Sequence, residues 1–264
     1  MNILYQVVDH CDLNCAGCDH GSPLAKPWTV DVDQFESDLC VLAAKVTVDE
    51  VILYGGEPLL HPQLPRLMTI ARTTCPTARL YIKTNGLRFR QWMTNKAFRT
   101  TLRVTGTRLE ITEYPPTAGL MARVNAEYPG LADQAATIDG EQGGVKRLMF
   151  RTKLHQPGDP WPSAETAHAH CYLRCQTAGL RVRSGKAYPC PLAMCAPVVF
   201  TDMLPGVPDA GVDIAKATVD QLLVASTGPC AFCAWCGGVD HGVQWSVSTR
   251  RAWEWLASTV KDEG

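Results

Sequence analysis

The distribution of cysteines constrains this chain more than any other feature of its sequence. Twelve cysteines occur in 264 residues, and most gather in two groups about 150 residues apart. The first group is Cys11, Cys15 and Cys18, the second is Cys171, Cys175, Cys190, Cys195, Cys230, Cys233 and Cys236, and Cys40 and Cys75 stand alone. Clustered thiols in a reducing compartment favour metal binding or catalysis over structural disulfides. The distribution therefore predicts two metal centres.

Charge and hydropathy limit the compartment and the partners. The 25 Lys and Arg residues nearly balance the 26 Asp and Glu residues, so electrostatics gives no reason to expect a nucleic acid or an anionic membrane. No apolar run approaches the ~20 residues of a membrane helix, and the N-terminus lacks the pattern of a signal peptide. We therefore expect a cytoplasmic protein with no nucleic-acid or membrane partner and with a small-molecule substrate open to it.

Up to about residue 140, apolar runs alternate with helix-like segments, which is the pattern of βα units around a parallel sheet. The expected strands are residues 2–8, 50–54, 79–84, 108–112 and 135–138. Helices are expected over residues 31–46, where Asp31 and Gln34 resemble a capping box, and over residues 65–73. The pattern predicts an α/β fold, as an open or closed barrel of βα units.

Polar segments follow the ends of the first three strands. They are the first cysteine group, Gly55-Gly56-Glu57-Pro58 and Asn85-Gly86. Because barrels of this type place their chemistry at the C-terminal ends of the strands, the three segments are expected to converge on one face.

The alternation is lost after residue 150, where 151–170 has the composition of a linker. Residues 180–183 and 186–188, around Ser184-Gly185, predict a β-hairpin. The Trp-rich tail, 243–260, predicts a helix that packs on the barrel. We accordingly expect a core over 1–150, a linker and cysteine-rich domain over 151–242, and a C-terminal helix over 243–264.

Three thiols within eight residues can hold a polynuclear iron–sulfur cluster, but no fourth cysteine follows as in a ferredoxin. The next one, Cys40, falls within the expected helix and is expected to pack as a small side chain. A cluster with three protein ligands leaves one iron open, as a catalytic centre requires. Zinc, with His10 or His20 as a fourth ligand, is the alternative.

The spacing Cys11-x3-Cys15-x2-Cys18 after a first strand, followed by Gly-Gly-Glu-Pro after a second, resembles the radical S-adenosylmethionine superfamily. This resemblance implies a partial (β/α)6 TIM-like barrel and a 4Fe-4S cluster whose open iron binds S-adenosylmethionine. It also implies reductive cleavage to a 5′-deoxyadenosyl radical, driven by an external one-electron donor such as flavodoxin or ferredoxin.

The resemblance assigns roles to individual residues. It implies Cys11, Cys15 and Cys18 as cluster ligands, Gly55, Gly56 and Glu57 at the methionine amino group, and Thr84, Asn85 and Thr112 at the ribose and the methionine carboxylate. Asn85-Gly86 is equally consistent with a simple turn. Gly17 departs from the family, which often has an aromatic residue there near adenine, and His20 is a candidate substitute.

The spacing Cys175-x9-Gly185-x4-Cys190 resembles the SPASM and twitch extensions, which carry auxiliary 4Fe-4S clusters. A glycine at the hairpin turn would bring two cysteines to one metal. The implied ligands are Cys175, Cys190, Cys233 and Cys236, with Cys171 and Cys230 as alternates. A zinc knuckle is the alternative for this group. Cys195 is either a packed side chain or a catalytic thiol that donates a hydrogen atom to a substrate radical.

The resemblance extends to proteins from polysaccharide- and sugar-modifying gene neighbourhoods. It implies dehydrogenation or epimerisation of a sugar, an aminocyclitol or a related small molecule, with help from the auxiliary cluster. The chain begins directly at the first strand with no leader-peptide-binding domain, which also favours a small substrate. A peptide maturase that crosslinks or epimerises its substrate is one alternative, and a non-catalytic zinc-binding interaction module is another.

Overall fold

The computed structural model describes residues 1–134, 144–157, 161–175 and 179–257 of the chain. One curved sheet contains β1 (Asn2–Val8), β2 (Glu50–Gly55), β3 (Arg79–Thr84), β4 (Arg108–Ile111), β5 (Ala132–Gln134), β7 (Leu180–Arg183), β8 (Lys186–Tyr188) and β9 (Val212–Asp213). Its order is β5-β4-β3-β2-β1-β7-β8-β9, and β1 to β5 and β7 pair in parallel. The α/β class and the partial-barrel sheet are confirmed.

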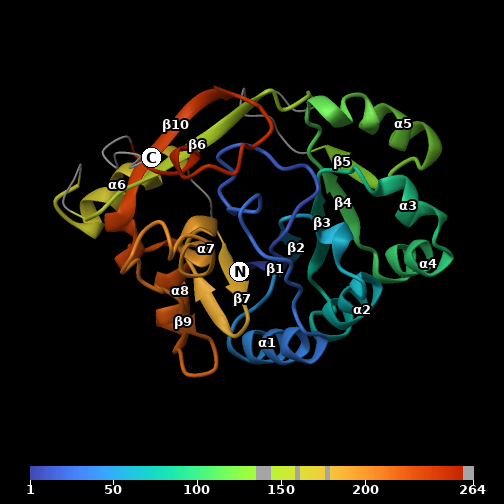
Figure 1. The fold of residues 1–264 in the computed structure, drawn as a ribbon. Coiled ribbons are helices and arrows are strands. Elements are labelled where there is room, and N and C mark those ends of the chain that lie inside the picture. Colours follow the sequence, from blue (N-terminus) through green and yellow to red (C-terminus); the bar gives the residue numbers. More distant parts are fainter. Residues whose placement is uncertain (135–143, 158–160, 176–178, 258–264) are drawn as a thin grey trace.

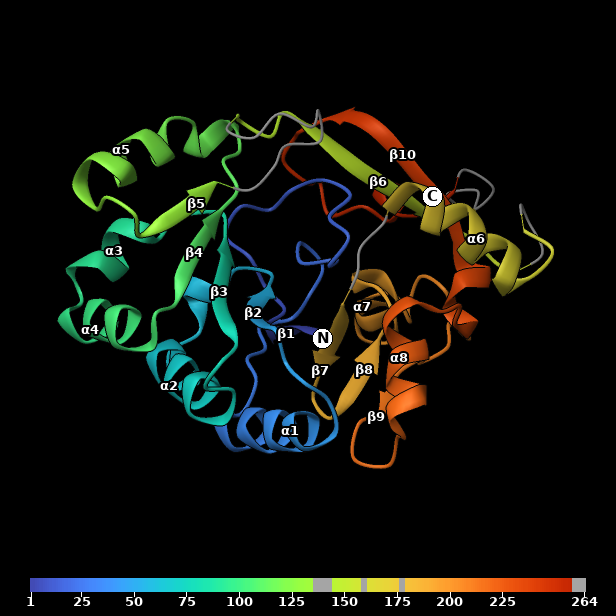
Figure 2. The same ribbon diagram turned by 180° about the vertical axis from the view of Figure 1, so that it is seen from behind.

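A second, two-stranded sheet pairs β6 (Leu148–Leu154) with β10 (Cys236–Gln244) in antiparallel orientation. Figures 1 and 2 show it as an arm that passes over the end of the curved sheet, above the long loop that follows β1. The second sheet therefore lies on the side of the barrel where the first cysteine group is found.

Helices cover the outer face of the curved sheet, as Figure 1 shows for α1, α2, α4 and α5. The α-helices are α1 (Val32–Lys45), α2 (Leu64–Thr74), α3 (Phe89–Thr94), α4 (Lys96–Thr105), α5 (Leu120–Glu127), α6 (Ala164–Cys175), α7 (Pro191–Val199) and α8 (Val219–Thr227). Short 3-10 turns are η1 (Pro58–Leu60), η2 (Pro115–Thr117), η3 (Ala231–Trp235) and η4 (Ala252–Glu254). Within the described ranges, no helix is long and apolar enough to cross a membrane.

The first strand and helix show how the sequence produces this packing. Alternate residues of β1 bury Ile3 and Tyr5 against the apolar stripe of α1, where the rings of Tyr5 and Phe35 meet at a centroid distance of 4.7 Å. The Asp31 side chain caps α1 by accepting from the backbone N–H groups of residues 33 and 34. The capping box is only half formed, because Gln34 Nε2 donates to Asp38 Oδ1 (2.7 Å) instead.

The expected strands 2–8 and 79–84 agree with β1 and β3, and 50–54 and 108–112 differ from β2 and β4 by one residue each. The expected helices 31–46 and 65–73 likewise correspond to α1 and α2. The expected strand 135–138 lies outside the described residues, directly after β5. The hairpin is confirmed as β7 and β8, and β7 pairs with β1, so the hairpin extends the main sheet.

Two expectations about the second half of the chain are wrong. The supposed linker 151–170 contains most of β6 and the start of α6. The supposed C-terminal helix is absent from the described part of the tail, where residues up to 244 complete β10 and only η4 is helical. Its backbone groups bond to the loop after β1 instead, as in Ala16 N–H to Ser246 O (2.9 Å). The domain limits at 150 and 242 stay predictions.

Candidate metal centres

The first cysteine group lies on the loop that follows β1. Asn14 and Gly17 have φ angles of 56° and 63°, so two left-handed residues turn this loop back on itself. Cys15 is buried and Cys11 and Cys18 are half-buried. All three pack in one cluster with Leu13, Tyr114 and Trp245. The loop therefore gathers its three thiols against a largely apolar wall.

Burial raises the pKa of both the Cys11 and the Cys15 thiols to about 12, and the neighbouring thiols add to the effect. Two N–H groups nevertheless donate to Cys11 Sγ, from Leu13 N (3.4 Å) and Asn85 Nδ2 (3.5 Å). A metal that binds here must displace the thiol protons, because cysteine coordinates as the thiolate. Three soft thiolate donors with N–H groups aimed at sulfur suit an iron–sulfur cluster that keeps one iron open.

The zinc alternative receives less support from the two histidines. His10 is occupied elsewhere, since its Nδ1 accepts a hydrogen bond from the backbone N–H of Trp28 (3.3 Å). In the described ranges, the one group of metal-binding side chains close enough for a single ion is Cys18, Asp19 and His20. In that group His20 Nδ1 already pairs with Asp19 Oδ1 (2.8 Å). Neither histidine lies with all three thiols in one compact set.

The Gly55-Gly56-Glu57 segment, at the end of β2, packs directly against the start of the cysteine loop. A Cβ on Gly55 would lie 2.1 Å from Val8 O, and one on Gly56 would lie 2.1 Å from His10 O. The backbone N–H groups of Gly56 and Glu57 donate to these same carbonyls, at 2.8 and 3.0 Å. Only glycine allows this approach, so the two glycines hold two functional loops together.

Glu57 is fully buried and connects the ends of β2 and β3. Its carboxylate accepts from Thr84 Oγ1 (2.7 Å), Asn85 N (2.8 Å) and Leu59 N (2.9 Å). Burial raises its pKa to about 7, although the three hydrogen bonds oppose the shift. Asn85 in turn donates to Cys11 Sγ and to Asp12 Oδ1, so Glu57 orients a residue that contacts the first cysteine group.

Thr112 lies just beyond β4, where its backbone N–H donates to Thr84 O (3.0 Å). The ends of β1 to β4 thus carry the cysteine loop, Glu57, Thr84, Asn85 and Thr112 along one edge of the sheet. This is the convergence that the sequence predicted for the polar segments after the strands.

The second cysteine group is assembled from four separate elements. Its described candidate ligands are Cys171 on α6, Cys190 at the N-cap of α7, Cys230 and Cys233 at η3, and Cys236 at the start of β10. Burial raises the pKa of Cys236 to about 12, and Cys190, Cys171 and Cys233 raise it further by their charge. The structure therefore brings the described primary candidates, Cys190, Cys233 and Cys236, together with the alternates Cys171 and Cys230. The side chain of Cys175 lies outside the described residues.

Within this group, Cys230 Sγ and Cys233 Sγ are 3.8 Å apart. The hydrogen bond between them lowers the pKa of Cys233 to about 7. Burial raises the pKa of Cys190 to about 12, and its Sγ accepts a hydrogen bond from Ala193 N (3.3 Å). The group thus combines one readily ionised thiol with several protonated ones.

Cys195, Cys75 and Cys40 are not among the candidate ligands of either metal centre. Cys195 is 2% exposed on the inner face of the sheet, where it packs with Ile52 and Tyr54 and its Sγ lies 3.7 Å from the Gln6 amide. Cys75 is buried in the main core, as packing requires. Cys40 is exposed on α1, so the expectation that it packs is wrong. It lies beside the buried stripe of that helix, directly after the buried Leu39.

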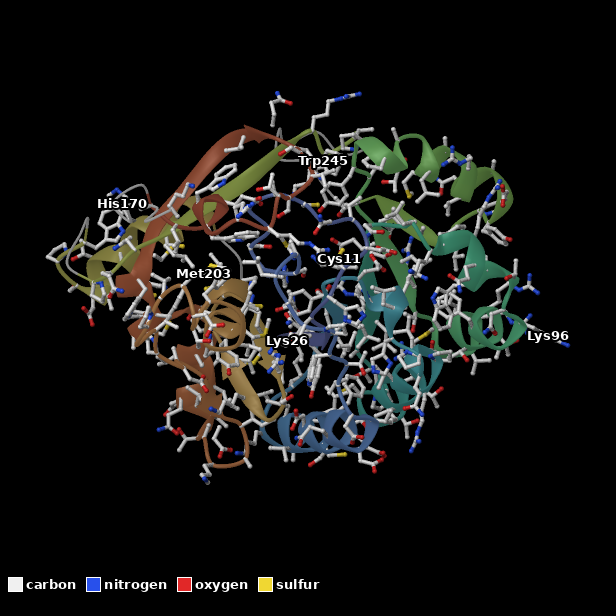
Figure 3. All side chains as sticks on the ribbon, viewed as in Figure 1. Cys11, Lys26, Lys96, His170, Met203 and Trp245 are labelled. Carbon is white, nitrogen blue, oxygen red and sulfur yellow. The ribbon has the colours of Figure 1, made fainter. Side chains whose placement is uncertain are left out.

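Two contacts around the first cysteine loop have no signal in the spacing of the motifs. Trp245 Nε1 donates to Cys15 Sγ (3.1 Å) from 230 residues away, and Figure 3 shows Trp245 above Cys11. Asp9, just after β1, forms a buried ion pair with Arg183 of β7 (2.7 Å). The tryptophan-rich tail was visible in the sequence, but nothing in it indicated which loop the tail would contact.

Known proteins resemble this chain in sequence and in fold. Residues 2–107 match the family model described as a 4Fe-4S single cluster domain. The chain is 36% identical to the GTP 3′,8-cyclase of Chlorobaculum tepidum over 81 residues, which are 31% of this chain and 24% of that protein. The chain thus spans about a quarter of the curated relative that it matches.

Two solved structures share the fold over most of the chain. BtrN in complex with AdoMet and 2-DOIA has a TM-score of 0.51 at 16% identity and covers 97% of this chain and 98% of its own. Native anSMEcpe with bound AdoMet and Cp18Cys peptide has a TM-score of 0.52 at 12% identity and covers 86% of this chain and 81% of its own. At these identities the likeness shows the fold alone.

The part of the chain that matches the 4Fe-4S single cluster domain contains the three-cysteine loop at the end of the first strand of the partial barrel. Together with the Gly-Gly-Glu-Pro segment after the second strand, this arrangement resembles the radical S-adenosylmethionine superfamily.

Proposed function

We propose that this protein cleaves S-adenosylmethionine reductively and uses the product to remove a hydrogen atom from a substrate. One observation carries the proposal: the three thiols of the loop after β1 lie together, next to the glycine-rich segment after β2. When bound, the cluster and S-adenosylmethionine supply a 5′-deoxyadenosyl radical, which is able to attack an unactivated C–H bond.

In this proposal the chain's own residues hold and shield the reactants. Cys11, Cys15 and Cys18 bind three irons, and their burial keeps water from the centre. Gly55, Gly56 and Glu57 contact the methionine amino group, and Thr84, Asn85 and Thr112 contact the ribose and the methionine carboxylate. Because the Glu57 carboxylate already accepts three hydrogen bonds, we assign it the positioning of Thr84 and Asn85 as well.

The second cysteine group is proposed to hold an auxiliary 4Fe-4S cluster. Thiolates around one zinc ion lie about 3.8 Å apart, whereas no three of the described thiols of this group lie within 4.8 Å of one another. This wider spacing suits a larger metal core. Oxidation of a substrate after loss of one hydrogen atom requires an acceptor for a second electron, and this group is where the chain is able to hold one.

For the substrate, we favour a sugar, an aminocyclitol or a related small molecule, which the protein dehydrogenates or epimerises. The similarity to BtrN supports this choice, since it extends over nearly the whole of both chains and that structure contains 2-DOIA. A peptide is the second candidate, supported by the fold shared with anSMEcpe, whose structure contains a peptide.

Metal content and product formation test the proposal. Anaerobically purified protein is expected to contain about eight irons per chain with matching sulfide, as two 4Fe-4S clusters require. With S-adenosylmethionine and a strong reductant it should form 5′-deoxyadenosine. Two zinc ions without sulfide would instead support a non-catalytic interaction module, and a folded, iron-replete protein that makes no 5′-deoxyadenosine would refute the radical mechanism.

Deuterium transfer then separates the two substrate classes. Deuterated aminocyclitols and sugars on one side, and deuterated peptides on the other, are incubated with loaded protein. Deuterium in the 5′-deoxyadenosine identifies the class from which hydrogen was removed, and transfer from peptides alone would overturn the preference for a small molecule.

A further inference from the structure

The segment that follows β10 folds back over the first cysteine loop. We call residues 245–256 the C-terminal strap. Its backbone pairs with the loop in both directions, because Ala16 N donates to Ser246 O (2.9 Å) and Ser248 N donates to Asn14 O (2.8 Å). An isolated bridge between Cys15 and Val247 lies between these bonds. Cys15, the middle cysteine of the loop, therefore lies in a short antiparallel pairing with the strap.

Trp245 begins the strap and places a polar donor on the thiol. Its backbone N–H bonds to Arg147 O (2.7 Å), which fixes the residue to the strand region of β6. Its indole Nε1 donates to Cys15 Sγ (3.1 Å), and the residue packs against the buried cluster of Leu13 and Cys15. A phenylalanine would fill the same space without the N–H group.

The other end of the strap is closed by a buried carboxylate. Glu254 is fully buried, and its Oε1 accepts from both the N–H and the hydroxyl of Thr249 (2.6 Å each). Its Oε2 accepts from Gly17 N (3.4 Å), and the neighbouring Trp255 donates to Cys18 O (2.8 Å). Glu254 therefore closes a turn of the strap and attaches it to the residue before the third cysteine.

We propose that the strap is a positioning element for the first cluster and that Trp245 tunes the reduction potential of that cluster through its hydrogen bond to Cys15. A donor to a ligand sulfur stabilises the more negative, reduced state of an iron–sulfur centre and so raises its potential. Burial of the loop beneath the strap limits the access of water, which is a second determinant of the potential. The inference rests on the proposed function only in assuming that Cys15 binds a cluster.

The test compares Trp245→Phe with wild type and with a control, Trp253→Phe, which changes a half-exposed tryptophan of the same strap. The midpoint potential of each anaerobically reconstituted protein is measured by a redox titration monitored by electron paramagnetic resonance. The signal of the first cluster is the one that disappears in Cys15→Ala. Trp245→Phe is expected to shift this midpoint to a more negative potential, whereas Trp253→Phe and the second signal stay in place.

An unchanged midpoint in a fully loaded Trp245→Phe protein would overturn the tuning role, as would an equal shift in Trp253→Phe. The result is separable from the proposed function, because the potentials are readable even if wild type forms no 5′-deoxyadenosine. Failure of that assay with a shifted midpoint would refute radical chemistry and keep the tuning role.

The positioning role has a separate readout, which is the rate at which iron passes to a chelator. Glu254→Gln removes the charge that closes the strap, and Glu36→Gln, on the exposed face of α1, is the matched control. Glu254→Gln is expected to lose the iron of the first cluster several-fold faster than wild type at equal helical content by circular dichroism. Equal rates in the two variants would overturn the positioning role.

Discussion

The two cysteine groups are built in opposite ways. The first lies on one loop of eight residues, and its thiols are neighbours because the chain turns at Asn14 and Gly17. The second takes its described thiols from α6, α7, η3 and β10, which are distributed between residues 171 and 236. Closing long loops costs more chain entropy than closing short ones. The first group is therefore specified largely by local sequence, and the second depends on the fold around it.

The first group also depends on a distant part of the chain. The C-terminal strap bonds to residues 14–18, and Glu57 reaches the loop through Asn85. The short cysteine motif is thus held by the strap and by Glu57, and the spacing of its cysteines predicts neither contact.

The largest expected effect comes from removing a thiol of the first group. Cys15→Ala should abolish 5′-deoxyadenosine formation and reduce the iron content from about eight to about four per chain, because the second cluster is held elsewhere. Cys40→Ala, at an exposed position of α1, is the control and should match wild type. Loss of all iron in Cys15→Ala would show that the two groups are not independent.

Removing a thiol of the second group should separate the cleavage of S-adenosylmethionine from the formation of the oxidised product. Cys190→Ala is expected to leave cleavage of S-adenosylmethionine measurable and to stop formation of the oxidised product, since the proposed acceptor for the second electron is lost. The assay follows 5′-deoxyadenosine and product together by mass spectrometry. Product at the wild-type rate would refute an essential auxiliary cluster.

The next substitution tests whether iron binding by the first group depends on the loop after β2. Gly56→Ala places a Cβ where only 2.1 Å separates it from His10 O, and relief of such a clash costs about 1–3 kcal/mol. We expect a lower midpoint in chemical denaturation and weaker iron retention by the first group. Gly106→Ala, where the nearest atom is 3.8 Å away, should cost about 1 kcal/mol and leave iron retention unchanged.

Prediction from sequence succeeded where local signals decided the structure. Apolar alternation located β1 and β3, and the Ser184-Gly185 pair located the hairpin of β7 and β8. It failed where contacts with residues distant in sequence determined the local structure. Backbone groups of the tail bond to the cysteine loop, a pairing that no local pattern indicates. The same limit explains why spacing alone could not choose between primary and alternate ligands in the second group.

Alkaline pH should distinguish the two groups in the metal-free protein. Burial raises the pKa of Cys15 from 9.0 to about 12, so its protonated form is favoured in the folded state. Its contribution to stability is complete below about pH 9 and is lost as the pH rises toward 12. Cys233, with its pKa lowered from 9.0 to about 7, has the opposite sign, because its contribution to stability is complete above about pH 9 and is lost as the pH falls toward 7.

Denaturation midpoints of the metal-free chain at about pH 8 and pH 10 measure this effect. Cys15→Ala should reduce the loss of stability between these two values, whereas Cys233→Ala should not reduce it. An identical loss in wild type and in Cys15→Ala would mean that the thiols of the first group are not buried as the structure places them.

The smallest effect is expected at Cys195, which is a member of the second group in sequence but is not one of the proposed metal ligands. Its thiol is enclosed between Gln6, Ile52 and Tyr54 on the inner face of the sheet, with 2% of the residue exposed. A hydrogen donor must reach the substrate radical, and a side chain packed in this way reaches only its neighbours. Cys195→Ala should therefore cost about 1 kcal/mol of stability, from the small cavity that it leaves, and keep the rate and stereochemistry of product formation. A product whose configuration changes in this variant would instead make Cys195 the hydrogen donor of an epimerase and would require the inner face of the sheet to open during the reaction.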